Sequence, residues 1–382
     1  MTAFRPADLP LDTPAMMATL RRWVQCESPS YDPAAVSRMA ALAADEILAM
    51  GAMVEQVPGR EGFGDCVRAR FAKPGAPGGG ILLMGHLDTV HPMGMLNDMP
   101  WREEDGRCHG PGILDMKSGI VLALAAIAAL RQAGLVPPLP ITVLLNSDEE
   151  VGSPSTRDLV EAEARRHRYV LIPEPARRSG GVVMGRHAVA RYKLVTRGRP
   201  AHAGLRLNEG RSAIQEMAHQ VIAIDRLSQP DCTFSTGVIR GGQWVNCVAR
   251  ECEAELLSVS TSEAALARGR QALADLRPTA PGTEIELVPG AVRPFWHTGA
   301  GDRALFETAS RIAADLGFDL VGEISGGGSD GNFTGAMGIP TLDGLGARGD
   351  FLHTRDEYIE IDSLAERGRL MAGLLMALSS WP

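Results

Sequence analysis

The chain has 382 residues, of which 45% are hydrophobic and 22% are charged, and its formal net charge is -8. A chain of this length is longer than usually folds around one hydrophobic core, so two domains are expected. The acidic balance argues against nucleic acid or an anionic membrane as a partner. The N-terminus has no apolar segment typical of a secretory signal, and we find no stretch apolar enough to span a bilayer. These features predict a cytoplasmic protein.

The first part of the chain alternates between helical and strand patterns. Helices are predicted at residues 33–50 and 117–133, each ended by a glycine, and short apolar strands at 80–85 and 141–146. A loop rich in glycine and proline lies at 74–80. Such alternation predicts an α/β fold with a mostly parallel sheet and flanking helices.

The middle of the chain follows a different order of elements. Two helices alternate with four strands, predicted at 188–196 (strand), 208–227 (helix), 233–239 and 248–259 (strands), 262–276 (helix) and 284–288 (strand). The order βαββαβ is that of a ferredoxin-like domain.

The last part returns to helices, predicted at 303–316 and 362–378 with a strand between them. The simplest organisation is a catalytic domain that is interrupted by a smaller one. We therefore predict a first catalytic part at 1–184, an inserted domain at 185–296 and a second catalytic part at 297–382.

Three adjacent acids, Asp148, Glu149 and Glu150, follow the apolar strand at 141–146. Ligand sites of α/β proteins gather at the carboxyl ends of strands. Three neighbouring carboxylates repel one another unless a positive charge lies nearby. They therefore form either a solvated acidic turn or part of a cation site.

His86 and Asp88 follow the apolar strand at 80–85. Residues i and i+2 of an extended chain point to the same side, so the two side chains can act as a pair. One would bind a metal while the other orients the imidazole. The alternative is an ordinary surface pair after a strand.

Three further residues are candidate metal ligands only when they are considered together. Asp115 lies between a Gly/Pro loop and an apolar helix, where it either caps the helix or bridges metal ions. Glu174 lies between two prolines after an apolar segment, as a turn residue or a ligand. His353 alone is a loop histidine.

Together the candidates comprise two histidines and three carboxylates. Nitrogen and oxygen donors without thiolate suit zinc, cobalt or manganese, and the six scattered cysteines form no CxxC motif. Five protein ligands exceed what one catalytic zinc uses. They suit two ions that share a bridging carboxylate, for which Asp115 is the candidate.

At this point the chain resembles a known family, the dinuclear zinc peptidases and amide hydrolases. That family includes glutamate carboxypeptidase (carboxypeptidase G), acetylornithine deacetylase and succinyl-diaminopimelate desuccinylase, and the first branch is the most similar. The matching segments run in family order over nearly the whole chain: MGHLDTV at 84–90, GPGILDMK at 110–117, NSDEEVGS at 146–153, PEP at 173–175, GRPAHAG at 198–204, VN at 245–246, GGGSD at 326–330 and HT at 353–354.

The resemblance implies roles for individual residues. The implied ligands of two divalent ions, zinc first and cobalt or manganese as alternatives, are His86, Asp115, Glu150, Glu174 and His353. It implies that Asp88 orients the first histidine and that Glu149 is the general base. It also implies a cis peptide after the bridging aspartate.

The inserted domain has implied roles as well. The resemblance implies that it pairs two subunits into a homodimer and that its His202 reaches the partner's active site, while Asn246 of the same domain is a candidate substrate contact. A tight loop at Gly327, Gly328 and Ser329 is expected to hold substrate. One departure concerns the α-carboxylate, because the arginine expected near position 259 is missing, and Arg293 or Arg186 is the possible substitute.

These observations predict a hydrolase that cleaves an amide bond of a small peptide or N-acyl amino acid. The alternatives are an amidohydrolase that recognises no α-carboxylate, and a scaffold that keeps the fold without the chemistry. A serine hydrolase is a remote alternative, because Ser329 lies in a GxSxG motif with Asp343 or Asp350 and His353 downstream. The same glycines fit a dinucleotide fingerprint, although no βαβ unit follows.

Overall fold

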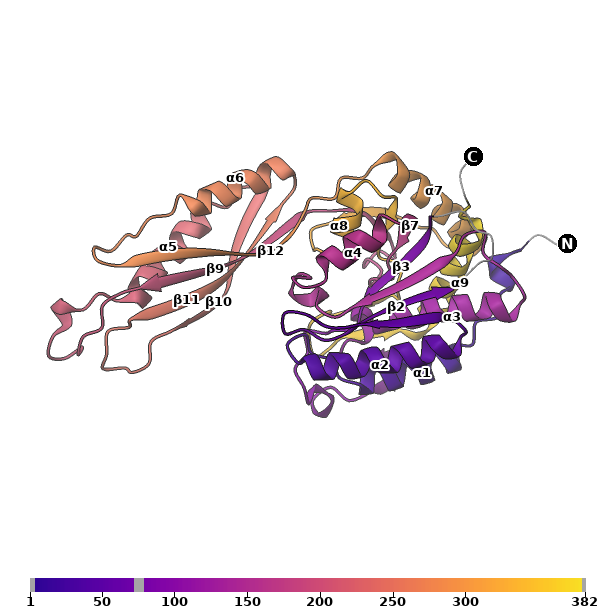
Figure 1. Cartoon of the computed structure of the whole chain (residues 1–382), viewed down its shortest axis with the longest axis horizontal. Helices are drawn as coiled ribbons and strands as arrows, with labels where there is room; N and C mark the ends of the chain where they lie inside the picture. The colour runs from indigo at the N-terminus through magenta and orange to yellow at the C-terminus, as the bar shows by residue number, and fades with distance from the viewer. Residues whose placement is uncertain (1–3, 72–78, 380–382) are drawn as a thin grey trace. The chain divides into compact units, whose positions relative to one another are not determined.

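The computed structural model describes residues 4–71 and 79–379, so most of the predicted loop at 74–80 lies outside the described part. The chain divides into two compact units (Figure 1). Unit 1 comprises Met1–Gly185, His297–Ile324 and Phe333–Pro382, and unit 2 comprises Arg186–Trp296 and Ser325–Asn332.

Unit 1 is built on a six-stranded sheet with the order β1-β2-β6-β3-β7-β14. The strands are β1 (Met53–Val57), β2 (Cys66–Phe71), β6 (Ile141–Asn146), β3 (Gly80–His86), β7 (His167–Leu171) and β14 (Thr341–Leu342). The last four are mutually parallel, whereas β2 is antiparallel to both of its neighbours, β1 and β6. Strands β3 and β6 are buried along their whole length, as expected for strands covered on both faces. The predicted α/β fold with a mostly parallel sheet is confirmed.

Helices flank this sheet (Figure 1). They are α1 (Thr13–Gln25), α2 (Pro33–Ala49), α3 (Ser118–Gln132), α4 (Arg157–Ala164), α7 (Ala300–Asp315), α8 (Gly331–Ala336) and α9 (Ile361–Ala377), with short turns η1 (Pro6–Asp8), η2 (Met95–Asn97), η3 (Ile113–Lys117) and η4 (Glu149–Val151). The start of α2 shows why they form where they do. Asp32 accepts a hydrogen bond from the Ala35 amide, and Pro33 stands at the first helical position.

The described chain also contains two smaller sheets besides the six-stranded sheet and the sheet of unit 2. A four-stranded sheet has the order β15-β16-β5-β4, with β15 (Gly349–Asp350), β16 (Tyr358–Glu360), β5 (Arg107–His109) and β4 (Arg102–Glu104). A pair is formed by β8 (Val182–Arg186) and β13 (Gly322–Ser325). The first of these sheets joins an early segment of the chain to a late one.

Unit 2 has the predicted βαββαβ order. Its elements are β9 (Ala188–Arg197), η5 (Leu207–Glu209), α5 (Ala213–Arg226), β10 (Cys232–Gly241), β11 (Glu251–Ser260), α6 (Glu263–Ala274) and β12 (Glu284–Arg293). The sheet order β10-β11-β9-β12, antiparallel throughout, is that of a ferredoxin-like fold. Both helices cover one face of this sheet (Figure 1).

The division into units differs at residues 325–332 from the sequence prediction, which assigns these residues to the second catalytic part. Hydrogen bonds explain the difference. The His187 amide donates to the Ser325 carbonyl at 2.9 Å, and the Asn332 side chain donates to the carbonyls of His187 at 3.0 Å and Pro294 at 2.7 Å. This loop therefore belongs to unit 2.

One helical stretch, Ile113–Gln132, has the length and mean hydropathy, 2.0, of a membrane span, contrary to the sequence prediction. However, 83% of its most apolar window is buried inside the protein. Its helix α3 packs against α9 and α1, so its apolar surface belongs to the core of unit 1.

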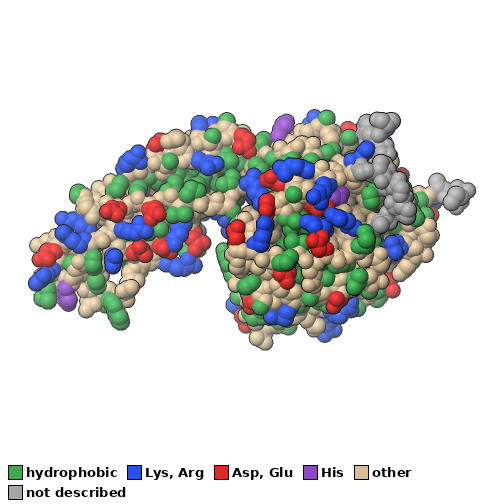
Figure 2. Space-filling model, viewed as in Figure 1, with side chains coloured by type: hydrophobic (Ala, Val, Ile, Leu, Met, Phe, Trp, Pro, Cys, Tyr) green, Lys and Arg blue, Asp and Glu red, His purple; other side chains and the backbone are tan. Residues whose placement is uncertain are grey.

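Charged side chains of both signs are interspersed on the face shown in Figure 2. In unit 2, Lys193 pairs with Glu253 and Arg240 pairs with Glu255 across neighbouring strands. Mixed charge of this kind is typical of a solvated surface, not of a basic face that binds nucleic acid.

Candidate metal centre

The candidate ligands gather at one edge of the large sheet. Strand β3 ends at His86, which pairs in register with Asn146 at the end of the parallel strand β6. Glu149 and Glu150 follow β6, and Glu174 follows the next parallel strand, β7. Since parallel strands end at the same edge, the topology itself brings these side chains together.

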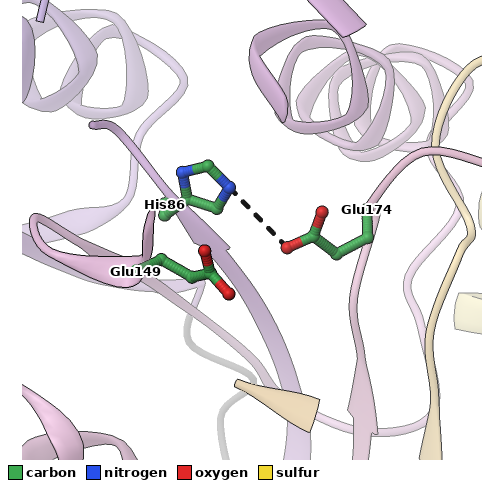
Figure 3. Close-up of side chains that lie close together, drawn as sticks. All are labelled: His86, Glu149 and Glu174. Atoms are coloured by element: carbon green, nitrogen blue, oxygen red, sulfur yellow. Dashed lines mark ion pairs between the residues drawn. The ribbon is translucent and has the colours of Figure 1, made fainter. Parts of the chain in front are cut away.

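Three of these side chains face one another closely (Figure 3). His86 Nε2 lies 3.7 Å from Glu174 Oε1. One donor atom each of His86, Glu149 and Glu174 lies within 4.8 Å of the other two. The exposed fractions of the three residues are only 1%, 8% and 7%, so their charges are not screened by bulk water.

Asp115 lies between the two histidines. Its Oδ1 is 3.1 Å from His86 Nε2, and its Oδ2 is 3.1 Å from His353 Nε2. His353 Nε2 also lies 3.3 Å from Glu150 Oε2. The five predicted ligands therefore form two groups that share one carboxylate.

Electrostatics in this cluster are dominated by burial and by mutual charge. Burial and the charge of Asp115 raise the pKa of Glu174 well above its ordinary value and also raise the pKa of Glu150. Burial lowers the pKa of His86, but hydrogen bonds with carboxylates outweigh it and hold this pKa well above its ordinary range. Hydrogen bonds to Asp115 and Glu150 raise the pKa of His353 to about 11.

This donor set fits divalent cations. All five groups offer nitrogen or oxygen, as zinc, cobalt and manganese accept. Burial first, and then the charge of Asp115, raise the pKa of the Glu150 and Glu174 carboxyls, and a bound cation would offset both effects. The peptide bond Asp115–Met116 is cis, as the resemblance implies.

Asp88 contacts more than the histidine that we expected it to orient. Its carbonyl oxygen lies 2.9 Å from His86 Nδ1, and its Oδ1 lies 3.5 Å from the same nitrogen. The carboxylate also accepts the amides of Glu149 at 3.1 Å and Glu150 at 3.2 Å, and the Ser30 hydroxyl at 2.6 Å. It therefore fixes both the imidazole and the backbone of the two glutamates.

Asp148, the first of the three consecutive acids, stabilises the turn and does not face the cluster. Its carboxylate accepts the Ser155 amide at 2.7 Å and the hydroxyls of Ser155 and Thr156. Burial raises its pKa to about 6. These contacts close the turn that carries Glu149 and Glu150, and only those two face the cluster.

Sequence reasoning missed one buried carboxylate beside the centre, Glu357. It accepts the backbone amides of Gly112, Leu114 and Asp115 and contacts the His91 ring. The available signal was its position four residues after His353 in a short loop, which alone is too weak to assign a role.

His202 and Asn246 lie together in unit 2. His202 forms an isolated β-bridge with Cys247, and the Ala203 amide donates to the Asn246 carbonyl at 2.9 Å. Both residues are exposed. The His202 Nδ1 accepts the amides of Gly204 and Leu205 at 3.1 and 3.2 Å, so a neutral ring carries its proton on Nε2.

Arg293 lies in unit 2 and is already paired. Its guanidinium is 2.8 Å from Asp330, and the two residues are 6% and 4% exposed. Arg186 donates to the carbonyl of Gly327 at 2.8 Å. The glycine loop at 327–328 is thus held by buried arginines of the same unit.

The serine-hydrolase and dinucleotide alternatives have no support in the geometry. Ser329 is fully buried, and its hydroxyl accepts the Gly331 amide at 3.0 Å. The His353 ring instead faces Asp115 and Glu150. The helix after the glycines, Gly331–Ala336, has only six residues, which is too short for the first helix of a dinucleotide-binding unit.

Comparison with known proteins agrees with this site. The model of peptidase family M20/M25/M40 matches residues 82–377. Carboxypeptidase G2 from Pseudomonas sp. (strain RS-16) is 27% identical over 385 residues, covering 97% of this chain and 90% of the relative. Acetylornithine deacetylase from Myxococcus xanthus is 28% identical over 256 residues, covering 63% of this chain and 65% of the relative.

A solved structure of a tripeptidase from Staphylococcus aureus has the same fold. It superposes with a TM-score of 0.75 at 21% sequence identity, covering 96% of this chain and 98% of that one. The family match spans well over half of the chain and includes all five candidate ligands. The chain therefore belongs to peptidase family M20/M25/M40, a family of metal-dependent hydrolases.

Proposed function

We propose that the protein is a dinuclear metallohydrolase that cleaves an amide bond of a small peptide or an N-acyl amino acid. One observation carries the proposal: the two oxygens of Asp115 face two different histidines, each at 3.1 Å. A carboxylate placed in this way is suited to bridge two divalent ions.

Each ion would have three protein ligands. One would be held by His86, Glu174 and Asp115, and the other by His353, Glu150 and Asp115. Zinc is the first candidate, and cobalt and manganese offer the same ligand chemistry. Bound there, the ions would supply Lewis acidity that polarises an amide carbonyl and favours ionisation of water.

Glu149 is the proposed general base. It lies beside Glu150 at the start of the helical turn η4, where successive side chains point in different directions around the turn axis. Its carboxylate lies within the group that also contains His86 and Glu174. It would accept a proton from the attacking water and return that proton to the leaving amine.

His202 of the partner subunit is proposed to donate a hydrogen bond to the oxyanion that develops on the carbonyl. Three facts support this role: the ring is exposed, its Nδ1 accepts two backbone amides, and Nε2 is therefore the donor. The proposal includes a homodimer formed through unit 2, with Asn246 beside His202 as a further substrate contact.

Substrate recognition is the less specific part of the proposal. Gly327, Gly328 and Ser329 are candidate substrate contacts, and Arg293 is the candidate partner of an α-carboxylate. However, Arg293 already pairs with Asp330, and position 259 is valine. This pairing favours a second candidate, an amidohydrolase whose substrate has no α-carboxylate.

A hydrolysis screen tests both candidates. The protein, loaded in turn with zinc, cobalt and manganese, is assayed on dipeptides, N-acyl amino acids and the matching N-acyl amines. Preference for the acids supports a carboxypeptidase-like enzyme, and preference for the amines supports the second candidate. Metal binding without hydrolysis of any of the three classes would contradict the proposed activity.

A further inference from the structure

Glu357 is a buried carboxylate to which neither the sequence nor the proposed mechanism gives a role. Only 1% of the residue is exposed. Its Oε1 accepts the amides of Leu114 at 2.8 Å and Asp115 at 3.1 Å, and its Oε2 accepts the amide of Gly112 at 3.3 Å. All three amides belong to the turn that carries Asp115.

His91 completes the environment of this carboxylate. Its Nε2 lies 2.7 Å from Glu357 Oε2, and the residue is 5% exposed. Because an ionised carboxylate only accepts hydrogen bonds, the imidazole donates from Nε2. Each oxygen of Glu357 then accepts two hydrogen bonds, so its acceptor sites are used within the protein.

The small sheet explains why Glu357 reaches this turn. Tyr358 in β16 pairs with His109 in β5, and the chain continues from β5 into the turn at Gly112. Glu357 directly precedes β16 and therefore lies beside that turn. His353 precedes it by four residues in the same loop, so Glu357 joins the segment that carries His353 to the segment that carries Asp115.

We propose that Glu357, held by His91, is the positioning residue that directs the two oxygens of Asp115 toward His86 and His353. The proposal rests on the metal centre of the proposed function. A carboxylate that accepts three amides of one turn fixes the orientation of that turn, and the direction of the Asp115 side chain follows from it. Glu357 itself binds neither metal nor substrate.

The first test replaces the carboxylate by an amide of the same shape, Glu357→Gln. The apoprotein is titrated with Co²⁺ and followed by calorimetry, visible absorption and metal analysis. We expect Co²⁺ to bind about 10–100-fold more weakly, with altered visible bands, because the amide offers fewer acceptor sites to the turn and Asp115 is the proposed ligand of both ions. With a substrate from the hydrolysis screen, kcat should fall while KM changes little.

Two variants of His91 test the same proposal if Glu357→Gln does not fold. His91→Phe removes the donor to Glu357, whereas His91→Gln keeps an N–H donor. The phenylalanine variant should show weaker Co²⁺ binding of the same kind, and the glutamine variant should restore binding toward that of the unaltered protein. The difference between them reports the hydrogen bond to Glu357.

Glu216→Gln is the matched control. Glu216 is also fully buried and also accepts backbone amides, from Thr279 at 2.9 Å and from Ala280 at 2.7 Å, but it belongs to unit 2. Its loss should lower thermal stability without changing Co²⁺ affinity or the visible bands.

Two results would overturn the proposal. One is unchanged Co²⁺ affinity and absorption in both Glu357→Gln and His91→Phe. The other is an equal loss of Co²⁺ affinity in Glu216→Gln, which would reduce Glu357 to a general structural role. If no amide is hydrolysed but two Co²⁺ ions still bind, the proposed function fails alone and the titrations still decide the role of Glu357.

Discussion

Three consecutive acids have three different environments in this protein. Asp148 turns inward to Ser155 and Thr156, Glu150 contacts His353, and Glu149 faces His86 and Glu174. Their amides are held in part by Asp88. Local backbone direction, not residue type, separates them, because three carboxylates of similar chemistry receive different partners.

The two glutamates of the triplet allow a direct comparison. Glu149→Ala should retain both metal ions and lose about 10²–10⁴-fold in kcat, the usual contribution of a general base. Metal content by elemental analysis and steady-state kinetics measure the two effects. Glu150→Ala is the matched variant and should lose metal. If Glu149→Ala lost the metal instead, the proposed roles of the two residues would be reversed.

Asp88→Asn should lower metal affinity, and kcat with it, by about 10–100-fold. The amide has only one acceptor oxygen, whereas the carboxylate uses two to hold His86 and the backbone amides of Glu149 and Glu150. Metal titration and kcat measure this effect. Asp302→Asn is the control, since Asp302 is also buried and accepts two backbone amides away from the centre. Equal losses in both variants would argue against a specific role of Asp88.

At the scale of elements, close approach of backbones sets the position of Glu174. Helix α3 begins beside the strand β7 exit, and a Cβ built on Gly119 would lie 1.7 Å from the Pro173 carbonyl oxygen. Only glycine permits this distance. The helix start and the segment that leads to Glu174 are therefore packed directly on each other.

Gly119→Ala should lower the free energy of unfolding by about 1–3 kcal/mol, as overpacking of a core does, and it should weaken metal binding because Glu174 follows Pro173. Denaturant unfolding of the apoprotein and a metal titration measure the two effects. Gly237→Ala is the control, because a Cβ there meets no atom within 4 Å. Unchanged stability of Gly119→Ala would contradict the close packing.

The continuous apolar pattern of a strand allows its bounds to be predicted, whereas a strand that carries charged side chains is missed. The strand at 141–146 was predicted at its observed bounds, whereas β2 (Cys66–Phe71) was missed. Its Arg68 and Arg70 obscure the apolar pattern, and both contact the buried Glu163. The ion pairs that make this strand possible involve a helix about a hundred residues away, which no local pattern reveals.

At the scale of the whole molecule, metal binding should be coupled to folding. Removal of metal by a chelator should lower the free energy of unfolding by about 2.7 kcal/mol relative to metal at 100 times its Kd. Thermal unfolding with chelator and after metal addition measures the change. His86→Ala should show a smaller shift, because it removes a ligand of one of the two ions, and an unchanged transition in the original protein would contradict the metal centre.

The proposed dimer makes a prediction that requires two subunits. Glu149→Ala and His202→Ala should each be nearly inactive, because each lacks one group of the reaction. In a mixture whose subunits have exchanged, half of the dimers are mixed and each has one complete site, so about a quarter of the activity should return. Light scattering confirms the dimer, and the absence of recovered activity would contradict the role of His202 across subunits.

The sequence by itself determined the α/β class, the ferredoxin-like order and the candidate ligands, because apolar periodicity and motif spacing are local properties of the chain. Only the tertiary structure decided which atoms meet. Asp115 lies between His86 and His353 because parallel strands end at one edge and the small sheet joins distant segments. The contacts of Glu357 and the pairing of Arg293 with Asp330 likewise depend on residues far apart in sequence, and contacts between such residues arise only when the chain folds.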